Sequence, residues 1–113
     1  MQMNRDKNLP LTETVYYVLL ALKEPAHGYA IMQKVEELSG GQVRLAAGTM
    51  YGAIENLQKK NLIISLPSDD PRRKMYTITD LGKAVLYADY QRMKFMLSTT
   101  EQIFGEVIPD EKI

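Results

Sequence analysis

The sequence predicts a mainly helical domain that carries one small β-hairpin and ends in a long helix. Three observations support this fold class. Apolar residues recur at helical spacing in three segments before residue 61. A β-branched run, a polar turn and an alternating run follow, which is the pattern of a hairpin. Helical spacing then returns over about 25 residues near the end of the chain.

The first half of the chain is expected to form three helices. The first ends at Glu24-Pro25, because the residue before proline is pushed out of helical geometry, and its apolar stripe is Leu11, Val15, Val18, Leu19 and Leu22. The second begins near Gly28, stops at Ser39-Gly40-Gly41, and carries inward Ile31, Met32, Val35 and Leu38. Gln42–Leu45 is a candidate short strand. The third helix is expected over residues 49–60, with Asn61 as its C-terminal cap.

Residues 62–79 are expected to form the hairpin. Leu62–Leu66 is the first strand, and Ser68-Asp69-Asp70-Pro71 is the turn. Lys74–Thr79 then alternates, which places Tyr76 and Ile78 on one side and Met75 and Thr77 on the other. Thr79 or Asp80 can cap the last helix, which reaches about Phe104. The predicted divisions are a domain over residues 9–79, a helix over residues 80–104 and a frayed tail over residues 105–113.

Composition excludes several classes of protein. The 113 residues favour one compact domain, and 45% apolar residues suffice for an ordinary core. Because the chain has no cysteine, disulfides, thiolate metal sites and cysteine nucleophiles are excluded. No stretch approaches the ~18 consecutive apolar residues of a membrane span, and Met1–Pro10 has no signal-peptide apolar region. We therefore expect a soluble cytoplasmic protein that does not associate with membranes.

The third helix has two distinct faces and directly precedes the hairpin. At helical periodicity Met50, Ala53, Ile54 and Leu57 fall together and are expected to face the core. In a helix-turn-helix the second helix of the pair lies in the major groove. The order of elements therefore predicts a winged helix-turn-helix with an added C-terminal helix. The candidate DNA-binding residues on the opposite face of the third helix are Thr49, Tyr51, Gly52, Asn56 and Lys59.

Individual residues on this face allow more than one interpretation. Thr49, Tyr51 and Asn56 can hydrogen-bond to base edges or to phosphate, and Asn suits adenine. Gly52 costs about 1 kcal/mol in a helix, so it is either a tolerated glycine or a place where another surface approaches the backbone. Glu55 either accepts from a cytosine amino group or, as we prefer, pairs with Lys59 four residues on.

The basic residues are concentrated locally, although fourteen Lys and Arg balance fourteen Asp and Glu overall. Residues 56–76 hold five bases and two acids, an excess of three. Arg72, Arg73 and Lys74 directly follow the turn, where a wing would place them along phosphates or in the minor groove. A mixed-charge surface or protection of a strand edge is the alternative. Three adjacent bases exceed what edge protection requires, so DNA binding is favoured.

Several stretches together resemble one family of regulators. They are His27-Gly28-Tyr29-Ala30-Ile31, Gly48-Thr49-Met50-Tyr51-Gly52-Ala53-Ile54 with Leu57 and Leu62-Ile63, and Arg73-Lys74-Met75-Tyr76-Thr77-Ile78-Thr79 with Leu81-Gly82-Lys83. Over roughly residues 9–104 the chain resembles the PadR-like transcriptional regulators, in the short subgroup with a single C-terminal dimerisation helix. The resemblance implies a repressor that is relieved by a small molecule. Some members stack planar ligands on tryptophan, and this chain has none.

His27 is the only histidine, so any metal site or catalytic triad would depend on it alone. No carboxylates at ligand spacing surround it. A capping or packing role in the turn between the first two helices is therefore preferred, and it matches the family's His-Gly-Tyr turn. We expect no enzyme activity, no catalytic residues, no metal and no cofactor.

The last helix has more apolar surface than a small domain can cover. One stripe is Leu81, Val85, Ala88, Met96 and Ile103, and the second, expected to form the dimer interface, is Leu86, Tyr90, Met93, Leu97 and Phe104. One stripe can dock on its own domain and the other on a partner chain, which predicts a homodimer. Met93 and Met96 suit either plain packing or a pocket for an apolar or aromatic effector.

These features lead to one preferred hypothesis and two others. The preferred hypothesis is a homodimeric repressor that binds double-stranded operator DNA of pseudo-palindromic sequence. A winged helix used for protein–protein contacts would show no DNA affinity at low salt. A small-molecule sensor would change conformation with its ligand before any operator is added.

Overall fold

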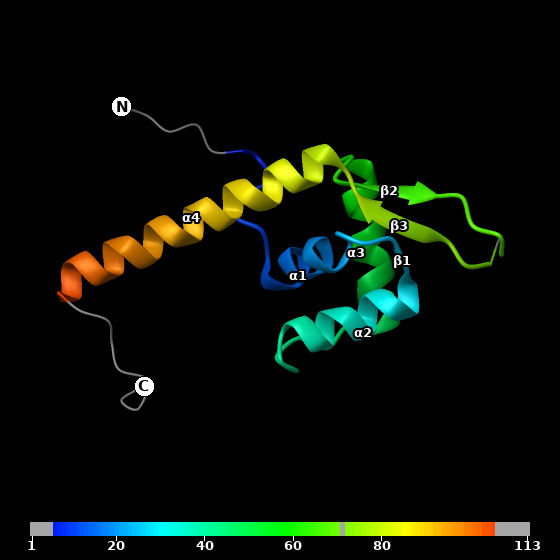
Figure 1. Cartoon of the computed structure of the whole chain (residues 1–113), viewed down its shortest axis with the longest axis horizontal. Helices are drawn as coiled ribbons and strands as arrows, with labels where there is room; N and C mark the ends of the chain where they lie inside the picture. The colour runs from blue at the N-terminus through cyan, green and yellow to red at the C-terminus, as the bar shows by residue number, and fades with distance from the viewer. Residues whose placement is uncertain (1–5, 71, 106–113) are drawn as a thin grey trace.

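The computed structural model describes residues 6–70 and 72–105, and it confirms a mainly helical fold with a small antiparallel sheet (Figure 1). The elements in chain order are α1 (Glu13–Ala21), β1 (Ala26–His27), α2 (Gly28–Leu38), α3 (Ala47–Lys59), β2 (Ile63–Leu66), β3 (Met75–Ile78) and α4 (Asp80–Phe104). The β2–β3 hairpin projects from one side of the helical body, and α4 projects from the opposite side (Figure 1). The frayed tail predicted over residues 105–113 lies outside the described residues except for Gly105.

The helix ends are fixed by short-range hydrogen bonds. Thr12 Oγ1 accepts from the Val15 N–H at 3.1 Å at the start of α1. Thr79 Oγ1 accepts from the Gly82 N–H at 2.9 Å at the start of α4, which confirms a threonine cap. At the end of α3, Asn61 has a φ of 61°. The Leu62 N–H donates to Leu57 O there at 3.0 Å. The C-cap itself is Lys60, one residue before the predicted Asn61, and Asn61 closes the helix in a left-handed conformation.

The sheet has the order β1-β3-β2, with both pairings antiparallel. The hairpin strands are confirmed, and Tyr76 and Ile78 are buried on one face. The strand predicted over Gln42–Leu45 is wrong, because the Ser39 hydroxyl accepts from the Val43 N–H at 2.9 Å and replaces a strand neighbour. The third strand is instead β1, which sequence analysis missed because two residues carry no detectable alternation.

The core lies between the first three helices and the inner face of the sheet. Its fully buried members include Leu19, Ile31, Met50 and Ile54, all on predicted inward faces. Leu38 was also expected to point inward, but it is exposed. The reason is that α2 ends there and places the following residue, Ser39, in the core, where its hydroxyl is hydrogen-bonded.

The α4 helix docks on α1 and β3 through its first half only. Its buried residues are Gly82, Val85 and Asp89, and Leu86 packs against the core. Val85 and Leu86 come from different predicted stripes, so the expectation that one stripe docks as a unit is wrong. Residues 11 and 18 positions apart share a helix face, so the uncovered second half of α4 continues this face with Met96, Leu97, Ile103 and Phe104.

A buried charge lies in this seam that sequence analysis did not anticipate. Asp89 is 1% exposed, and its Oδ1 accepts from Arg92 Nε at 2.6 Å. Tyr16 of α1 lines the same hollow as Asp89. Burial first, and then the negative charge of Asp89, raise the pKa of the Tyr16 phenol. The seam between α1 and α4 is therefore apolar with one internal ion pair. No helix within the described ranges is long and apolar enough to cross a membrane.

Gly82 of α4 lies against the backbone of Leu62, the residue before β2. A β-carbon there would overlap the Leu62 carbonyl oxygen and lie 2.7 Å from Ile78 Cγ1. We expect Gly82→Ala to lower the free energy of unfolding by about 2–3 kcal/mol, because backbone must move to make room. Urea unfolding monitored by circular dichroism measures this. Gly52→Ala is the matched control, since nothing lies within 4 Å of that position; it should stabilise by up to about 1 kcal/mol. Equal stability of the Gly82 variant and the unaltered protein would contradict the close approach.

Candidate nucleic-acid interface

The α3 helix presents a buried face and a polar exposed face. Met50, Ile54 and Leu57 are buried, as predicted, and Ala53 is partly buried. The N-terminal end of α3 has no side-chain cap, so its first N–H groups are available to an external acceptor. All five predicted DNA-binding residues of this helix are exposed: Thr49, Tyr51, Gly52, Asn56 and Lys59.

The charge on this face is partly compensated. Lys59 Nζ lies 3.3 Å from Glu55 Oε1, which confirms the predicted pair four residues apart. Both side chains are largely exposed, so the pair contributes little to stability. Gly52 faces open space, so the fold of this chain does not require glycine there. Both interpretations of Gly52 stay open.

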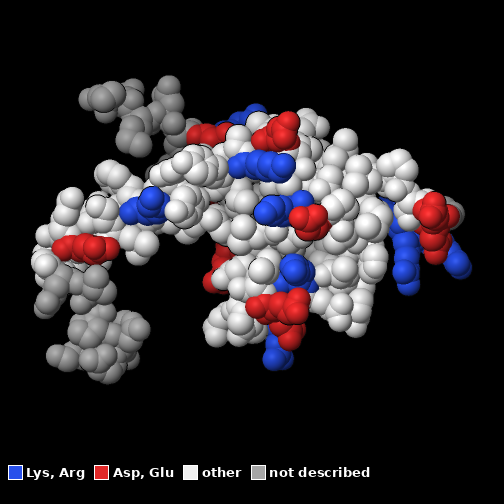
Figure 2. Space-filling view, in the orientation of Figure 1, with Lys and Arg blue, Asp and Glu red and all other residues white. Residues whose placement is uncertain are grey.

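The wing supplies most of the positive charge. Arg72, Arg73 and Lys74 are exposed between the turn and β3. Arg72 Nε lies 3.4 Å from Asp70 Oδ1, but the arginine side chain is 90% exposed, so the pair is weak. Arg73 and Lys74 form no ion pair within residues 6–70 and 72–105. Figure 2 shows blue side chains projecting from the hairpin end of the molecule, beside acidic side chains at its tip.

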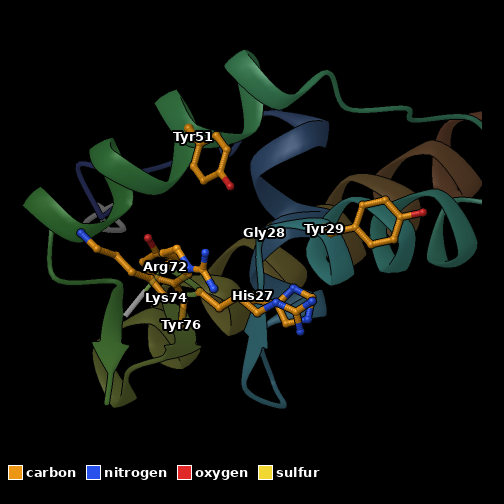
Figure 3. A pocket seen from close by; sticks show the side chains of 8 residues that line it. His27, Gly28, Tyr29, Tyr51, Arg72, Lys74 and Tyr76 are labelled. Carbon is orange, nitrogen blue, oxygen red and sulfur yellow. The ribbon is translucent and has the colours of Figure 1, made fainter. Parts of the chain in front are cut away.

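A cleft joins the wing to α3 and to the start of α2 (Figure 3). It is open, has a volume of about 510 Å³ and is lined by His27, Gly28, Tyr29, Tyr51, Arg72, Arg73, Lys74 and Tyr76. Tyr51 projects across it from α3, and Tyr76, Arg72 and Lys74 lie on the other side (Figure 3). The structure thus brings together four of the predicted residues and leaves Thr49, Gly52, Asn56 and Lys59 outside the cleft lining.

Sequence analysis missed four residues of this cleft, namely His27, Gly28, Tyr29 and Tyr76. His27 occupies the N-cap position of α2, but its side chain makes no capping hydrogen bond, so of the two expected roles, capping or packing, capping is wrong for the imidazole. Tyr76 was predicted only as a core residue of the hairpin. Tyr29 follows Gly28 in the first turn of α2. Their convergence depends on the pairing of Ala26 with Tyr76 and of His27 with Met75, and no sequence pattern signals that pairing.

The described residues offer no metal-binding cluster beside this cleft. Among residues 6–70 and 72–105, no three His, Asp or Glu side chains are grouped so that they could hold a metal ion. The lining of the cleft contains no carboxylate. The site therefore favours an anionic surface.

The fold and the exposed elements define a winged helix-turn-helix domain with an added C-terminal helix. The sequence profile of the transcriptional regulator PadR-like family matches residues 17–88, and the chain belongs to this family. A PadR family transcription regulator from Clostridium difficile R20291 is similar, with 30% identity and a TM-score of 0.69 over 82% of this chain and 99% of that one. A PadR family regulator from Eggerthella lenta shares 27% identity and a TM-score of 0.66 over 80% of each chain.

One curated relative is longer than this chain. An uncharacterized 37.1 kDa protein in transposon TN4556 of Streptomyces fradiae is 34% identical over 95 residues, which are 83% of this chain and 26% of the relative. The chain thus spans about a quarter of that protein. The family consists of transcription regulators rather than enzymes.

Proposed function

We propose that this protein is a repressor that binds a pseudo-palindromic operator as a homodimer. One observation carries the proposal: Tyr51, on the exposed face of α3, and the three cations of the wing line one cleft, which has no carboxylate in its lining. A recognition helix in the major groove and a wing on adjacent phosphates need this arrangement. Thr49 and Asn56 lie on the exposed face, where base edges would lie. Repression itself follows from the family resemblance.

A mobility shift with the DNA upstream of the protein's own gene tests this function. Across a salt series we expect specific retention near ~10 nM protein and weaker retention of a scrambled duplex. The affinity should fall steeply with salt, because cation–phosphate contacts release counterions. Retention of neither duplex at low salt would contradict DNA binding and favour a protein-contact role for the winged helix.

The proposed dimer forms through the uncovered half of α4. Leu97 is 63% exposed, and Phe104, two helical turns further along the same face, is exposed as well. The predicted interface residues fall into two groups. Leu86 and Met93 are partly buried within the chain, whereas Tyr90, Leu97 and Phe104 are exposed. An exposed apolar face of this length is typical of an oligomer interface. A two-fold axis through it would place two recognition helices about 34 Å apart.

Leu97→Glu is expected to convert the dimer to a monomer without unfolding it, because a charge would be buried at the interface. Light scattering after size exclusion measures the mass. Phe95→Glu is the matched control, since Phe95 is also exposed but lies on the opposite side of α4. A dimeric Leu97 variant, or a monomeric Phe95 variant beside it, would contradict the proposed face.

We propose the groove between α1 and α4 as the site of a small-molecule effector. This groove measures about 490 Å³ and is lined mostly by apolar and aromatic side chains, namely Tyr16, Leu19, Leu20, Lys23, Ile78, Lys83, Leu86, Tyr87 and Tyr90. An apolar or aromatic molecule suits such a lining. A ligand there would touch the helix that sets the dimer geometry, so it could change the spacing of the recognition helices. The planar-ligand mechanism that uses tryptophan is not available to this chain.

A further inference from the structure

Hydrogen-bond donors from three elements converge on the cleft between the wing and α2. The first-turn N–H groups of α2 have no side-chain cap, so they carry the partial positive charge of a helix N-terminus. Tyr51 of α3 and Tyr76 of β3 reach the cleft from two sides. Arg72 and Lys74 border its outer edge (Figure 3). All of these groups can donate to an anion.

The hydroxyl of Tyr51 is directed at the start of α2. An ideal β-carbon on Gly28 would lie 2.8 Å from the Tyr51 hydroxyl oxygen and 2.9 Å from Met50 Cε. Glycine at position 28 therefore lets the Tyr51 hydroxyl lie against the backbone of the first turn of α2. The Tyr51 hydroxyl therefore packs against Gly28 in the first turn of α2, at the end of the helix whose N–H groups are uncapped.

Tyr76 provides a second and independent observation. The residue is only 6% exposed, yet it lines the cleft. Within the described part of the chain no side-chain polar atom is buried without a partner, and the Tyr76 hydroxyl makes no hydrogen bond there, so it is accessible from the cleft. Burial, and secondarily the neighbouring Tyr51, raise the pKa of the Tyr76 phenol, so this group stays protonated and remains a donor at neutral pH.

We infer that the cleft binds one phosphate group of the DNA backbone, which accepts hydrogen bonds from the Tyr51 and Tyr76 hydroxyls and from the first turn of α2. Arg72 and Lys74 neutralise its charge. This inference rests on the proposed DNA-binding function and deepens it. Tyr51 then fixes the position of α3 on the duplex instead of contacting a base, and base recognition is left to Thr49 and Asn56.

Tyr51→Phe and Tyr76→Phe test this assignment, because each removes one hydroxyl and keeps the ring. The probes are a duplex from upstream of the protein's own gene and a scrambled duplex of the same composition. We expect each variant to bind both duplexes about ten- to a hundredfold more weakly, as for a lost hydrogen bond to a charged group. The salt slope should stay unchanged, because no cation is removed. Tyr17→Phe, on α1 away from the cleft, is the control and should bind as the unaltered protein does.

Duplexes that carry one neutral methylphosphonate at a time locate the phosphate. The affinity of the unaltered protein should fall when the neutral group stands at one particular position of each half-site. For Tyr76→Phe, the neutral group at that same position should lower the affinity little further. Inorganic phosphate alone, at about 10 mM, should leave the melting temperature of the protein unchanged. If phosphate instead stabilised the protein and Tyr76→Phe abolished this stabilisation, the cleft would bind free phosphate, and the backbone assignment would be overturned.

Gly28→Ala keeps the proposal testable if a phenylalanine variant folds poorly. Alanine is a better helix former than glycine, but its methyl group must displace the Tyr51 hydroxyl. DNA affinity should therefore fall on both duplexes while the circular dichroism spectrum is kept. A loss confined to the specific duplex would assign Tyr51 to base contact and overturn the inference, as would unchanged affinity in all three variants. Failure of the unaltered protein to bind either duplex would overturn the proposed function as well.

Discussion

Replacing Arg72, Arg73 and Lys74 together with glutamine is expected to weaken DNA binding by about two to three orders of magnitude near 0.15 M salt. In a dimer the change removes cations from both wings. Each lost phosphate contact flattens the plot of log affinity against log salt by about 0.9, so the slope should fall by up to about five. Arg72 should contribute least, because Asp70 already pairs with it. Mobility shifts over a salt series measure both quantities.

A matched variant separates the wing from net charge. Lys23, just after α1, and Lys83 and Lys94, on α4, are exposed away from the wing. Their replacement by glutamine gives the same change in formal charge. This control should lose far less affinity than the wing variant. Both variants should unfold at the same denaturant concentration as the unaltered protein, because exposed side chains contribute little to stability. Equal salt slopes for the two triple variants would contradict the wing assignment.

The helices were predictable because their signals are local. Apolar periodicity placed α1, α2, α3 and α4, and it identified the buried face of α3 through Met50, Ile54 and Leu57. The cap at Thr79 and the left-handed closure at Asn61 were also predictable, since each depends on a few neighbouring residues. The exposed candidates on α3 and the wing followed from the same periodicity, although their contacts with DNA are still predictions.

Contacts between distant segments were not predictable in the same way. The cleft depends on β1, a two-residue strand that pairs with β3 about fifty residues later in the chain. The direction of the Tyr51 side chain depends on the glycine at position 28, which belongs to another helix. Asp89 shares a helix face with Val85, but its charge would place it at the surface, and only the docking of α4 on α1 buries it. In each case the deciding neighbour is far away in sequence.

The Asp89–Arg92 pair is expected to be the most sensitive point of the α1–α4 seam. Arg92→Leu should lower the free energy of unfolding by about 3–5 kcal/mol, because it leaves a buried carboxylate without its partner. Asp89 is almost fully buried and Arg92 Nε is its hydrogen-bond donor at 2.6 Å. Urea unfolding at a fixed protein concentration measures the loss, which keeps any contribution of dimerisation constant.

The double variant Asp89→Asn with Arg92→Leu distinguishes charge from packing. An amide costs less to bury than an unpaired carboxylate, so the double variant should recover a large part of the stability that Arg92→Leu loses. Lys94→Leu, on the same helix but exposed over the Tyr90 ring, is the control and should change stability little. Equal instability of the single and double variants would mean that the packing of the arginine side chain, and not the buried charge, holds the seam.

This seam fixes the direction in which α4 leaves the domain. A variant that loosens the seam should therefore weaken operator binding more than binding to scrambled DNA, because only the operator requires a fixed spacing between two recognition helices.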